Sequence, residues 1–321
     1  MNAGSEPRSL PLRAVAIVGP TAVGKSGLGV ELARVFNADV ISADSRQVYR
    51  YMDVGTDKVS LGVRAQIPHF MLDVVAPDDV YSAQRYRDEA LRVLCRSAGA
   101  GRLPLVVGGT GFYMRTLLDG VQFPRVAPNP AFREALRRDE LEAGAASLHR
   151  RLQSLDPRSA ERIHPNNLPR IIRALEVVEA LGGPVPESPI ENPIPTLYIG
   201  LAMERQRLHA IADRRVEQQF SSGLVEETER LLDMGYSASL PSLDGLAYRQ
   251  AVGYLQGALT REEGIREYKS ATHRYIRRQM TWFRQDDRIR WIDSGPSALA
   301  DAASLIRKWL SAVERGLSTA P

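Results

Sequence analysis

A glycine-rich loop between a predicted strand and a predicted helix constrains the fold of this chain more than any other feature. The segment GPTAVGKS matches the pattern G-x-x-x-x-G-K-[ST], follows the apolar run Ala14–Val18 and leads into a helix that extends to about Phe36. The glycines let the backbone wrap around an anion, Lys25 adds a positive charge, and the Ser26 hydroxyl can bind Mg²⁺. We therefore expect a polyphosphate or pyrophosphate site at Gly19, Pro20, Thr21, Ala22, Val23, Gly24, Lys25 and Ser26.

Strand and helix patterns alternate along the first 120 residues, which predicts a parallel sheet with helices on both faces. This is an α/β fold of the P-loop NTPase type. Ser82 is placed to cap the N-terminus of one of the helices. Ligands of such folds bind beyond the carboxyl ends of the strands, so Gly19, Asp44 and residues 108–110 should meet in one cleft. The expected strands cover residues 14–18, 38–44, 69–75 and 103–109.

The composition changes after about residue 120, because eleven of the 20 prolines lie between Pro124 and Pro195. Helical spacing of apolar residues persists among them, which favours a helical insertion over a disordered linker. A strand then returns to the sheet, and the remainder of the chain is predicted to be mainly helical. The expected domains are a flexible N-terminal tail (1–13), a core domain (14–120 and 196–316) and a helical insertion domain (121–195).

The cysteine and charge content exclude some classes of protein. The single cysteine, Cys95, rules out a disulfide within the chain and a cysteine-rich zinc site; we expect it at a helix core position and the protein in the cytoplasm. No run of about 18 apolar residues is present, so no membrane span is expected, nor does the N-terminus resemble a secretory signal. Only four of the 42 lysines and arginines are lysines, which fits either a compositional bias or phosphate and base recognition by guanidinium groups.

Several polar residues follow the predicted strands and suggest the chemistry. A kinase or NTPase with this loop would place a carboxylate near Mg²⁺, and both Asp44 and Asp73 are candidates. Asp44, however, leads into the polar segment Ser45, Arg46 and Gln47, whose side chains can contact a nucleobase or phosphate. Thr110 follows another strand and its hydroxyl could reach the same cleft. Asp44 could instead cap a turn or helix, and Thr110 could cap the helix that follows it.

Six segments resemble, in order and in sequence, those of bacterial tRNA dimethylallyltransferases. The resemblance extends from about residue 14 to about residue 310. ADSRQVYR and GGTGFY beside this loop are far more specific than the loop alone. The six segments are GPTAVGKS, ISADSRQVYRYMDVGTDK, IPHFMLDVVAPDDVYSA, LPLVVGGTGFY, RIIRALEV and RRQMTWFR.

The resemblance implies a prenyl transfer. The donor would be dimethylallyl diphosphate, the cofactor Mg²⁺, and the acceptor the N6 amine of the adenine just 3′ of the anticodon in certain tRNAs. Asp44 matches the general base and Thr110 a residue that contacts the donor and the reacting centre. Arg215 matches an arginine that reaches the pyrophosphate, so the loop would hold a leaving group rather than ATP. A monomer without an obligate protein partner is the family expectation.

The resemblance also implies contacts with a tRNA anticodon stem-loop, which the helical insertion would embrace. The long C-terminal helix carries basic residues at helical spacing with aromatic residues between them, although a solvated basic face would look the same. The residues expected to contact tRNA are Asp44, Ser45, Arg46, Gln47, Arg170, Arg173, Tyr248, Arg249, Arg277, Arg278, Gln279, Trp282 and Arg284.

The chain departs from the family pattern at a few positions. Ala247 stands where the family usually has glycine, and Ile211 where it often has arginine. Gly27 and Gly29 are unusual inside a helix, each less favourable than alanine by about 1 kcal/mol.

Three other functions are compatible with parts of the sequence. They are prenyl transfer to free adenine nucleotides, a small-molecule kinase, and a non-catalytic nucleotide switch that binds RNA. A mononucleotide acceptor would need neither the insertion nor the long basic helix.

Overall fold

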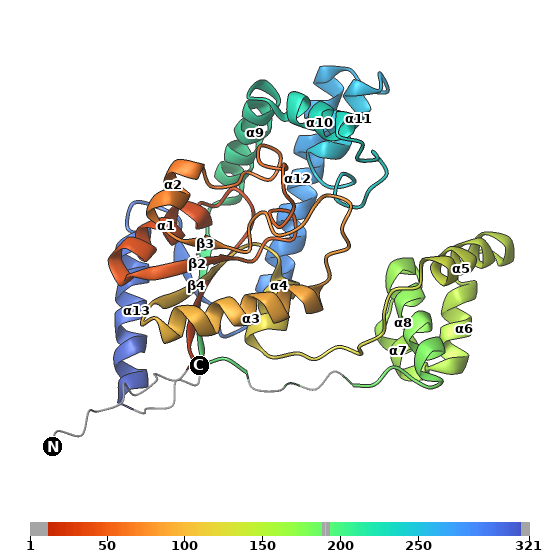
Figure 1. Cartoon of the computed structure of the whole chain (residues 1–321), viewed down its shortest axis with the longest axis horizontal. Helices are drawn as coiled ribbons and strands as arrows, with labels where there is room; N and C mark the ends of the chain where they lie inside the picture. Colours follow the sequence, from red (N-terminus) through yellow and green to blue (C-terminus); the bar gives the residue numbers. More distant parts are fainter. Residues whose placement is uncertain (1–11, 188–189, 191–192, 316–321) are drawn as a thin grey trace. The chain divides into compact units, whose positions relative to one another are not determined.

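The computed structural model describes residues 12–187, 190 and 193–315 (Figure 1). All but Leu12 and Arg13 of the predicted tail over residues 1–13 therefore lies outside the described residues. The chain divides into two compact units, the first formed by Met1–Gly120 with Asn192–Pro321 and the second by Val121–Glu191. Within the described ranges, no helix is both long and apolar enough to cross a membrane.

A six-stranded parallel sheet forms the centre of the first unit, with the strand order β3-β2-β4-β1-β5-β6. The central strand β1 is fully buried, and it pairs with β4 on one side and β5 on the other. The predicted parallel α/β sheet is confirmed. The strands are β1 (Ala14–Val18), β2 (Ala38–Ser42), β3 (His69–Phe70), β4 (Leu103–Val107), β5 (Thr196–Ala202) and β6 (Arg290–Asp293).

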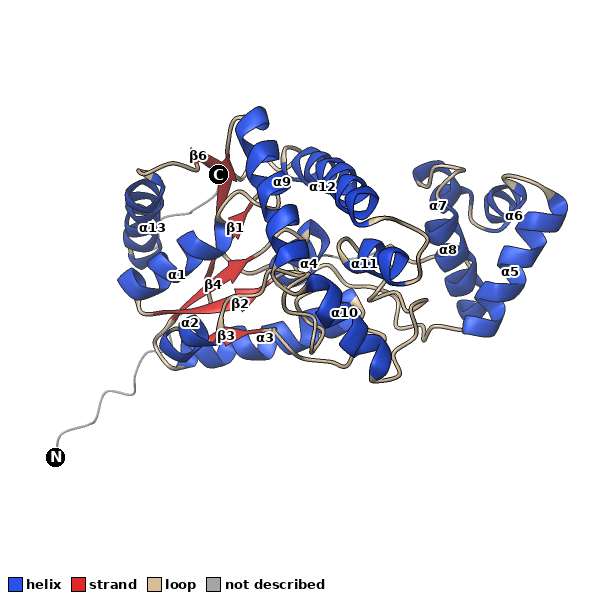
Figure 2. Cartoon of the chain, turned by 90° about the horizontal axis from the view of Figure 1, so that it is seen from above, coloured by secondary structure: helices blue, strands red, loops and turns tan. Residues whose placement is uncertain are grey.

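Helices cover both faces of this sheet (Figure 2). Val15 and Ile17 of β1 pack toward α1 and α13, whereas Ala14 and Ala16 pack toward α3 and α4, because successive side chains of a strand point to opposite faces. The helices of this unit are α1 (Lys25–Phe36), α2 (Leu61–Gln66), α3 (Ala83–Gly99), α4 (Gly111–Leu118), α9 (Arg205–Ser221), α10 (Leu224–Asp233), α11 (Tyr248–Leu255), α12 (Arg261–Phe283) and α13 (Ala298–Glu314).

A third hydrophobic cluster lies beside the carboxyl ends of the strands. It joins α9, α10, α11 and α12 to the loop that follows β2, and Met52, Phe220 and Tyr248 are among its buried members. The long helix α12 begins with a capping box in which Thr260 and Glu263 each satisfy the other's backbone N–H. This cluster holds the C-terminal helices beside the carboxyl ends of the strands, where ligands of such folds bind.

The described residues of the second unit form four helices, α5 (Pro130–Ala143), α6 (Ser147–Leu155), α7 (Pro157–Arg162) and α8 (Leu168–Leu181). They enclose a small core that includes Leu136, Leu152 and Leu175. Proline occupies the first turn of α5, α7 and α8, where a missing N–H costs nothing. Three prolines of this unit, Pro130, Pro157 and Pro169, therefore mark helix starts.

Two details differ from the sequence-based expectations. The strand expected over residues 69–75 ends at Phe70, because Met71 and Asp73 adopt left-handed backbone with φ of 64° and 55°. Cys95 lies on α3 but is exposed, so the prediction of a core position was wrong. The buried stripe of α3 consists of Tyr86, Ala90, Leu94 and Ser97, and Cys95 lies about 100° around the helix from Leu94 and nearly opposite Tyr86.

Candidate active site

A cavity of about 1060 Å³ lies in the first unit, beyond the carboxyl ends of the central strands. The predicted meeting of the glycine-rich loop with the segment after β2 is seen here, since Lys25, Ser26, Asp44 and Arg215 all contribute to its wall. The cationic side chains on the wall are Lys25, Arg46, Arg215, Arg249, Arg274 and Arg278. The acidic ones are Asp44, Asp57, Asp244 and Glu267.

The glycine-rich loop follows β1 and has left-handed backbone at three positions. Gly19 has φ 140°, and a Cβ there would lie 2.7 Å from the Leu201 carbonyl oxygen, so no other residue fits. Ala22 and Gly24 have φ of 66° and 98°, and α1 begins directly after Gly24 without a side-chain cap. The uncapped N–H groups at this helix N-terminus can donate hydrogen bonds to a bound anion.

Lys25 is held across the loop by a hydrogen bond from its Nζ to the carbonyl oxygen of Pro20, at 2.6 Å. Burial lowers the pKa of Lys25 to about 8, with Asp44 opposing that shift and Arg215 adding to it. A bound diphosphate would supply the negative charge that keeps this amine protonated.

Asp44 and Thr110 stand at the ends of neighbouring strands. Asp44 Oδ1 accepts a hydrogen bond from the Arg46 backbone N–H at 2.8 Å, and Oδ2 has no hydrogen-bond partner among the described residues. The Thr110 hydroxyl accepts from the Ser45 N–H at 3.0 Å, and Thr110 does not cap α4 with its side chain. Gly108 permits this contact between strands, because a Cβ there would lie 2.1 Å from the Ala43 carbonyl oxygen. Thr110 thus orients the turn that carries Asp44.

Tyr275 of α12 completes this part of the cavity wall. Burial raises the pKa of Tyr275 to about 12, and the Thr110 side chain slightly opposes that shift. Tyr275 therefore stays protonated at neutral pH. The sequence pattern identified Tyr275 only as an aromatic residue between basic ones.

Arg215 reaches the glycine-rich loop from α9. Its Nη2 donates to the Thr21 hydroxyl at 2.5 Å and its Nη1 to the Asp57 carboxylate at 2.9 Å. The Nε atom is buried and has no partner in the described part of the chain. Arg215 therefore lies where the prediction needs it, beside the phosphate loop. Asp57 was not singled out from the sequence, although it follows a Gly-Thr pair in a turn.

The loop of residues 53–58, here called the Asp57 loop, is firmly anchored. Glu227 of α10 is buried and accepts hydrogen bonds from the backbone N–H groups of Asp53, Val54 and Gly55, at 2.8, 2.8 and 3.1 Å. Gln47 donates to the carbonyl oxygens of Thr56 and Asp57 at 3.1 and 3.4 Å. These contacts fix the backbone of the loop from both sides.

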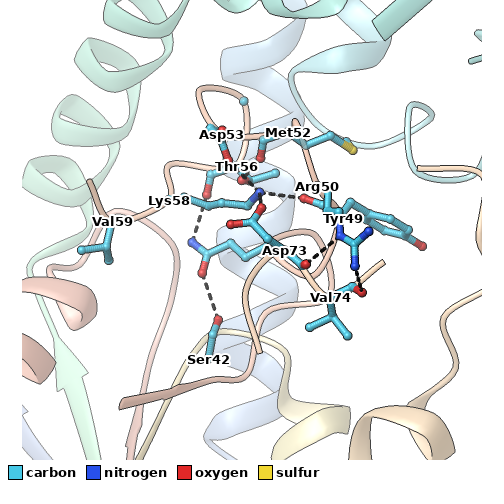
Figure 3. Close-up of polar contacts among 12 residues, drawn as sticks. Ser42, Tyr49, Arg50, Met52, Asp53, Thr56, Lys58, Val59, Asp73 and Val74 are labelled. Carbon is cyan, nitrogen blue, oxygen red and sulfur yellow. Dashed lines mark hydrogen bonds and ion pairs between the residues drawn. The ribbon is translucent and has the colours of Figure 1, made fainter. Parts of the chain in front are cut away.

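Lys58 anchors the end of the Asp57 loop (Figure 3). Its side chain is 1% exposed and donates to the Tyr49 carbonyl oxygen and to the carboxylates of Asp53 and Asp73, at 2.6, 2.7 and 2.6 Å. Burial of Asp73 opposes its ionisation, but the hydrogen bonds from Lys58 and Arg64 outweigh that effect and lower the pKa of Asp73. Asp73 is committed to this network and does not line the cavity, which removes it as a magnesium ligand.

Two residues expected to contact tRNA lie in the interior instead. Tyr248 is 1% exposed and its hydroxyl donates to Glu227 at 2.6 Å, so Tyr248 supports the Asp57 loop through Glu227. This burial contradicts a direct contact of Tyr248 with RNA. Gln279 is also buried, accepting from the Thr21 N–H and donating to the Gly109 carbonyl oxygen, both at 2.9 Å. Sequence patterns missed these roles because the residues that Tyr248 and Gln279 bind are remote from them in the chain.

Other residues with predicted RNA contacts remain accessible. Arg277 and Arg284 are exposed on and just after α12, and Arg278 is exposed over the Tyr275 ring at 5.6 Å. Trp282 is half-buried and packs against Gly111, where a Cβ would lie 2.1 Å from the indole Nε1. Ser45, Arg46, Gln47 and Arg249 line the cavity, although Arg46 also donates to the Pro241 carbonyl oxygen at 2.7 Å.

The second unit contains the two remaining candidates for RNA contacts. Arg170 is exposed at the start of α8. Arg173 is paired with Glu176, a buried carboxylate that also receives Arg133 at 2.7 Å. Burial of Glu176 opposes its ionisation, but these hydrogen bonds and one from the Asn129 N–H lower its pKa to about 2. Arg173 is therefore partly used in holding the helices of its own unit together.

The cavity wall fits a magnesium ion that arrives with a phosphate ligand. No cluster of three or more histidine, cysteine or acidic side chains able to hold a metal occurs in the part of the chain that the structure describes. The exposed Ser26 hydroxyl offers an oxygen donor on the cavity wall beside the phosphate loop. Mg²⁺ commonly takes few protein oxygens and completes its shell with phosphate and water, and this donor set suits that habit.

Most of this sequence matches the sequences of named enzymes. The sequence model of the IPP transferase family matches residues 47–286. A tRNA dimethylallyltransferase of Roseiflexus sp. (strain RS-1) is 46% identical over 301 residues, which covers 93% of this chain and 99% of that protein. One of Geobacter sulfurreducens is 42% identical over 284 residues, covering 87% and 91% of the two chains.

Solved structures agree with these relatives. The full-length tRNA isopentenylpyrophosphate transferase of Bacillus halodurans is 35% identical with a TM-score of 0.72, covering 95% of this chain and 98% of that one. A eukaryotic dimethylallyltransferase acting on tRNA is 25% identical with a TM-score of 0.74, covering 93% and 79%. Sequence, fold and the residues around the cavity lead to one conclusion: the chain belongs to the IPP transferase family.

Proposed function

We propose that this enzyme transfers a dimethylallyl group from dimethylallyl diphosphate to the N6 amine of the adenine 3′ of a tRNA anticodon. Family membership supports tRNA prenyl transfer as the reaction class. The observation that carries the assignment of residues is the convergence of the phosphate loop, Asp44 and Arg215 on one cavity. A cytoplasmic location is consistent with tRNA as the acceptor.

The reaction breaks the allylic C1–O bond of the donor and forms a bond between C1 and N6. Negative charge grows on the pyrophosphate as it leaves, and the loop N–H groups, Lys25 and Arg215 are the groups that would stabilise it. Mg²⁺, bound at Ser26, would supply further positive charge to the diphosphate. In such a site the phosphate loop serves a leaving group rather than ATP.

The acceptor amine loses a proton as the new bond forms. We assign that proton to Asp44, whose Oδ1 is held by the Arg46 N–H while Oδ2 lacks a partner in the described chain. Thr110 fixes the turn that carries this carboxylate. The adenine must leave its stack to reach Asp44, which is cheaper for a loop base than for a paired one. Arg170, Arg277, Arg278 and Arg284 are each proposed to contact phosphates of the tRNA.

Replacement of Asp44 tests this assignment. Asp44→Ala should lower single-turnover rates by about 10²–10⁴-fold because the positioned base is lost. Affinity for tRNA, measured by filter binding, should change less than about twofold. Asp78→Ala, which removes an exposed carboxylate away from the cavity, is the matched control. A rate within threefold of the wild type for Asp44→Ala would remove Asp44 from the role of base.

A comparison of acceptors separates the proposal from transfer to a free nucleotide. AMP and an anticodon stem-loop RNA are offered together with labelled donor, and the label in each product is counted. The proposal expects label in the RNA alone. Label predominantly in AMP would assign the enzyme to the other class of transferase.

A further inference from the structure

The proposed mechanism leaves one carboxylate at the phosphate end of the cavity unexplained. Asp57 Oδ2 accepts from Arg215 Nη1 at 2.9 Å, and the same guanidinium donates to Thr21 of the phosphate loop at 2.5 Å. Asp57, Arg215, Thr21 and Lys25 all line the cavity. The arginine expected to bind the diphosphate is therefore already paired with a negative charge.

The pair is asymmetric in its exposure and support. The Asp57 side chain is 57% exposed, whereas that of Arg215 is 24% exposed. The carboxylate can therefore return to water at little cost, while the guanidinium stays against the loop. The backbone under Asp57 is fixed by Glu227, Gln47 and Lys58. Displacement of Asp57 thus requires only a rotation of its side chain.

The charged groups that act on Lys25 are Arg215, Asp44 and Asp57, so this group of four side chains sums to zero. The cavity wall as a whole has two more cationic than acidic side chains. A diphosphate without a metal would repel Asp57 and compete with it for Arg215. A diphosphate that carries a divalent cation brings positive charge with it, and this repulsion is then reduced.

We propose that Asp57 is a displaceable counter-ion of Arg215 that makes the site select a metal-bound diphosphate over a free one. Before the donor binds, Asp57 holds Arg215 in place. When the metal–diphosphate complex binds, it displaces the carboxylate from the guanidinium. This inference rests on the proposed function, since it concerns the same diphosphate site.

Calorimetric titration of the full-length enzyme with inorganic pyrophosphate tests it, once in Mg²⁺ and once in EDTA. The wild type should bind strongly only in Mg²⁺. Asp57→Asn should raise the affinity in EDTA by about tenfold or more, because one repulsive charge is removed, and should change the affinity in Mg²⁺ by less than about threefold. Asp57→Gly, which suits the left-handed φ of 54° at this position, should behave in the same way.

Asp244→Asn is the matched control, because Asp244 pairs with Arg249 at 3.6 Å on the wall of the same cavity. It should bind pyrophosphate like the wild type under both conditions. The inference is overturned if Asp57→Asn leaves the affinity in EDTA unchanged, or if it weakens binding in Mg²⁺ as loss of a metal ligand would. If the wild type binds no pyrophosphate under either condition, the phosphate site itself is contradicted and the proposed function fails with it.

Discussion

Gln279 connects the phosphate loop to the segment that leads into α4, and its replacement should weaken both. Its amide satisfies the part-buried Thr21 N–H and the buried Gly109 carbonyl oxygen, each at 2.9 Å. Methionine has a similar length but makes neither hydrogen bond. Leaving a buried group unpaired costs about 1–3 kcal/mol, and the part-buried Thr21 N–H belongs at the low end of that range, so we expect Gln279→Met to lower the free energy of unfolding by about 3 kcal/mol in total.

A loss of this size is measurable by thermal denaturation. For a domain of this size, 1 kcal/mol corresponds to about 2–4 °C, so the Tm should fall by about 6–12 °C. Pyrophosphate affinity should fall as well, since the loop loses its brace. Gln285→Met, an exposed position just after α12, should change stability by less than about 0.5 kcal/mol.

The same variant distinguishes a structural brace from a contact with RNA. If Gln279 acts as a brace, tRNA affinity measured well below the Tm should stay within about twofold of the wild type. If Gln279 instead turns outward and contacts the acceptor, tRNA affinity should fall while the Tm stays constant. A Tm within 2 °C of the wild type would refute the reasoning from the two hydrogen bonds of Gln279.

Three further perturbations have defined outcomes. The Lys25 amine, with its pKa lowered to about 8, is charged below that pH, and a bound diphosphate favours the charged form. Pyrophosphate affinity measured by calorimetry should therefore fall by up to tenfold per pH unit above about 8. This part of the pH dependence should vanish in Lys25→Met. Alanine at Arg277 or at Arg284 should weaken tRNA binding and reduce the slope of log affinity against log salt by about 1 each, whereas Arg92→Ala, at an exposed position on α3, should leave the slope unchanged. Ala247 is buried with φ 76°, a conformation that disfavours any side chain, so Ala247→Gly should raise stability by about 1 kcal/mol in urea denaturation; a loss of stability would show that the methyl group matters more than the strain.

The parts of the site that depend on local sequence could be predicted. The glycine-rich loop needs only its own residues and the flanking strand and helix. Asp44 and Thr110 could be brought together because parallel strands place their carboxyl ends at one edge. The exposure of Cys95 could also have been found, since the apolar stripe of α3 at Tyr86, Ala90 and Leu94 leaves it on a different face.

The remaining parts depend on contacts between distant segments. Arg215 meets Asp57, and Glu227 meets the loop that carries Asp57, only after α9 and α10 have packed beside the sheet edge. Gln279 and Tyr248 have side chains common at RNA-binding surfaces, and composition does not reveal that their polar atoms are satisfied inside the protein. The helix spacing of these residues fixes a face of the helix but not what lies against that face.

In the proposed reaction the phosphate loop holds the pyrophosphate leaving group while the dimethylallyl group passes to RNA. The most direct measurement incubates the purified enzyme with tRNA, Mg²⁺ and dimethylallyl diphosphate labelled in the allyl group, without ATP. We expect mass analysis of the nucleosides to find the label on the adenine 3′ of the anticodon, with one pyrophosphate released per label. A requirement for ATP with transfer of phosphate, or label on no nucleoside, would contradict it.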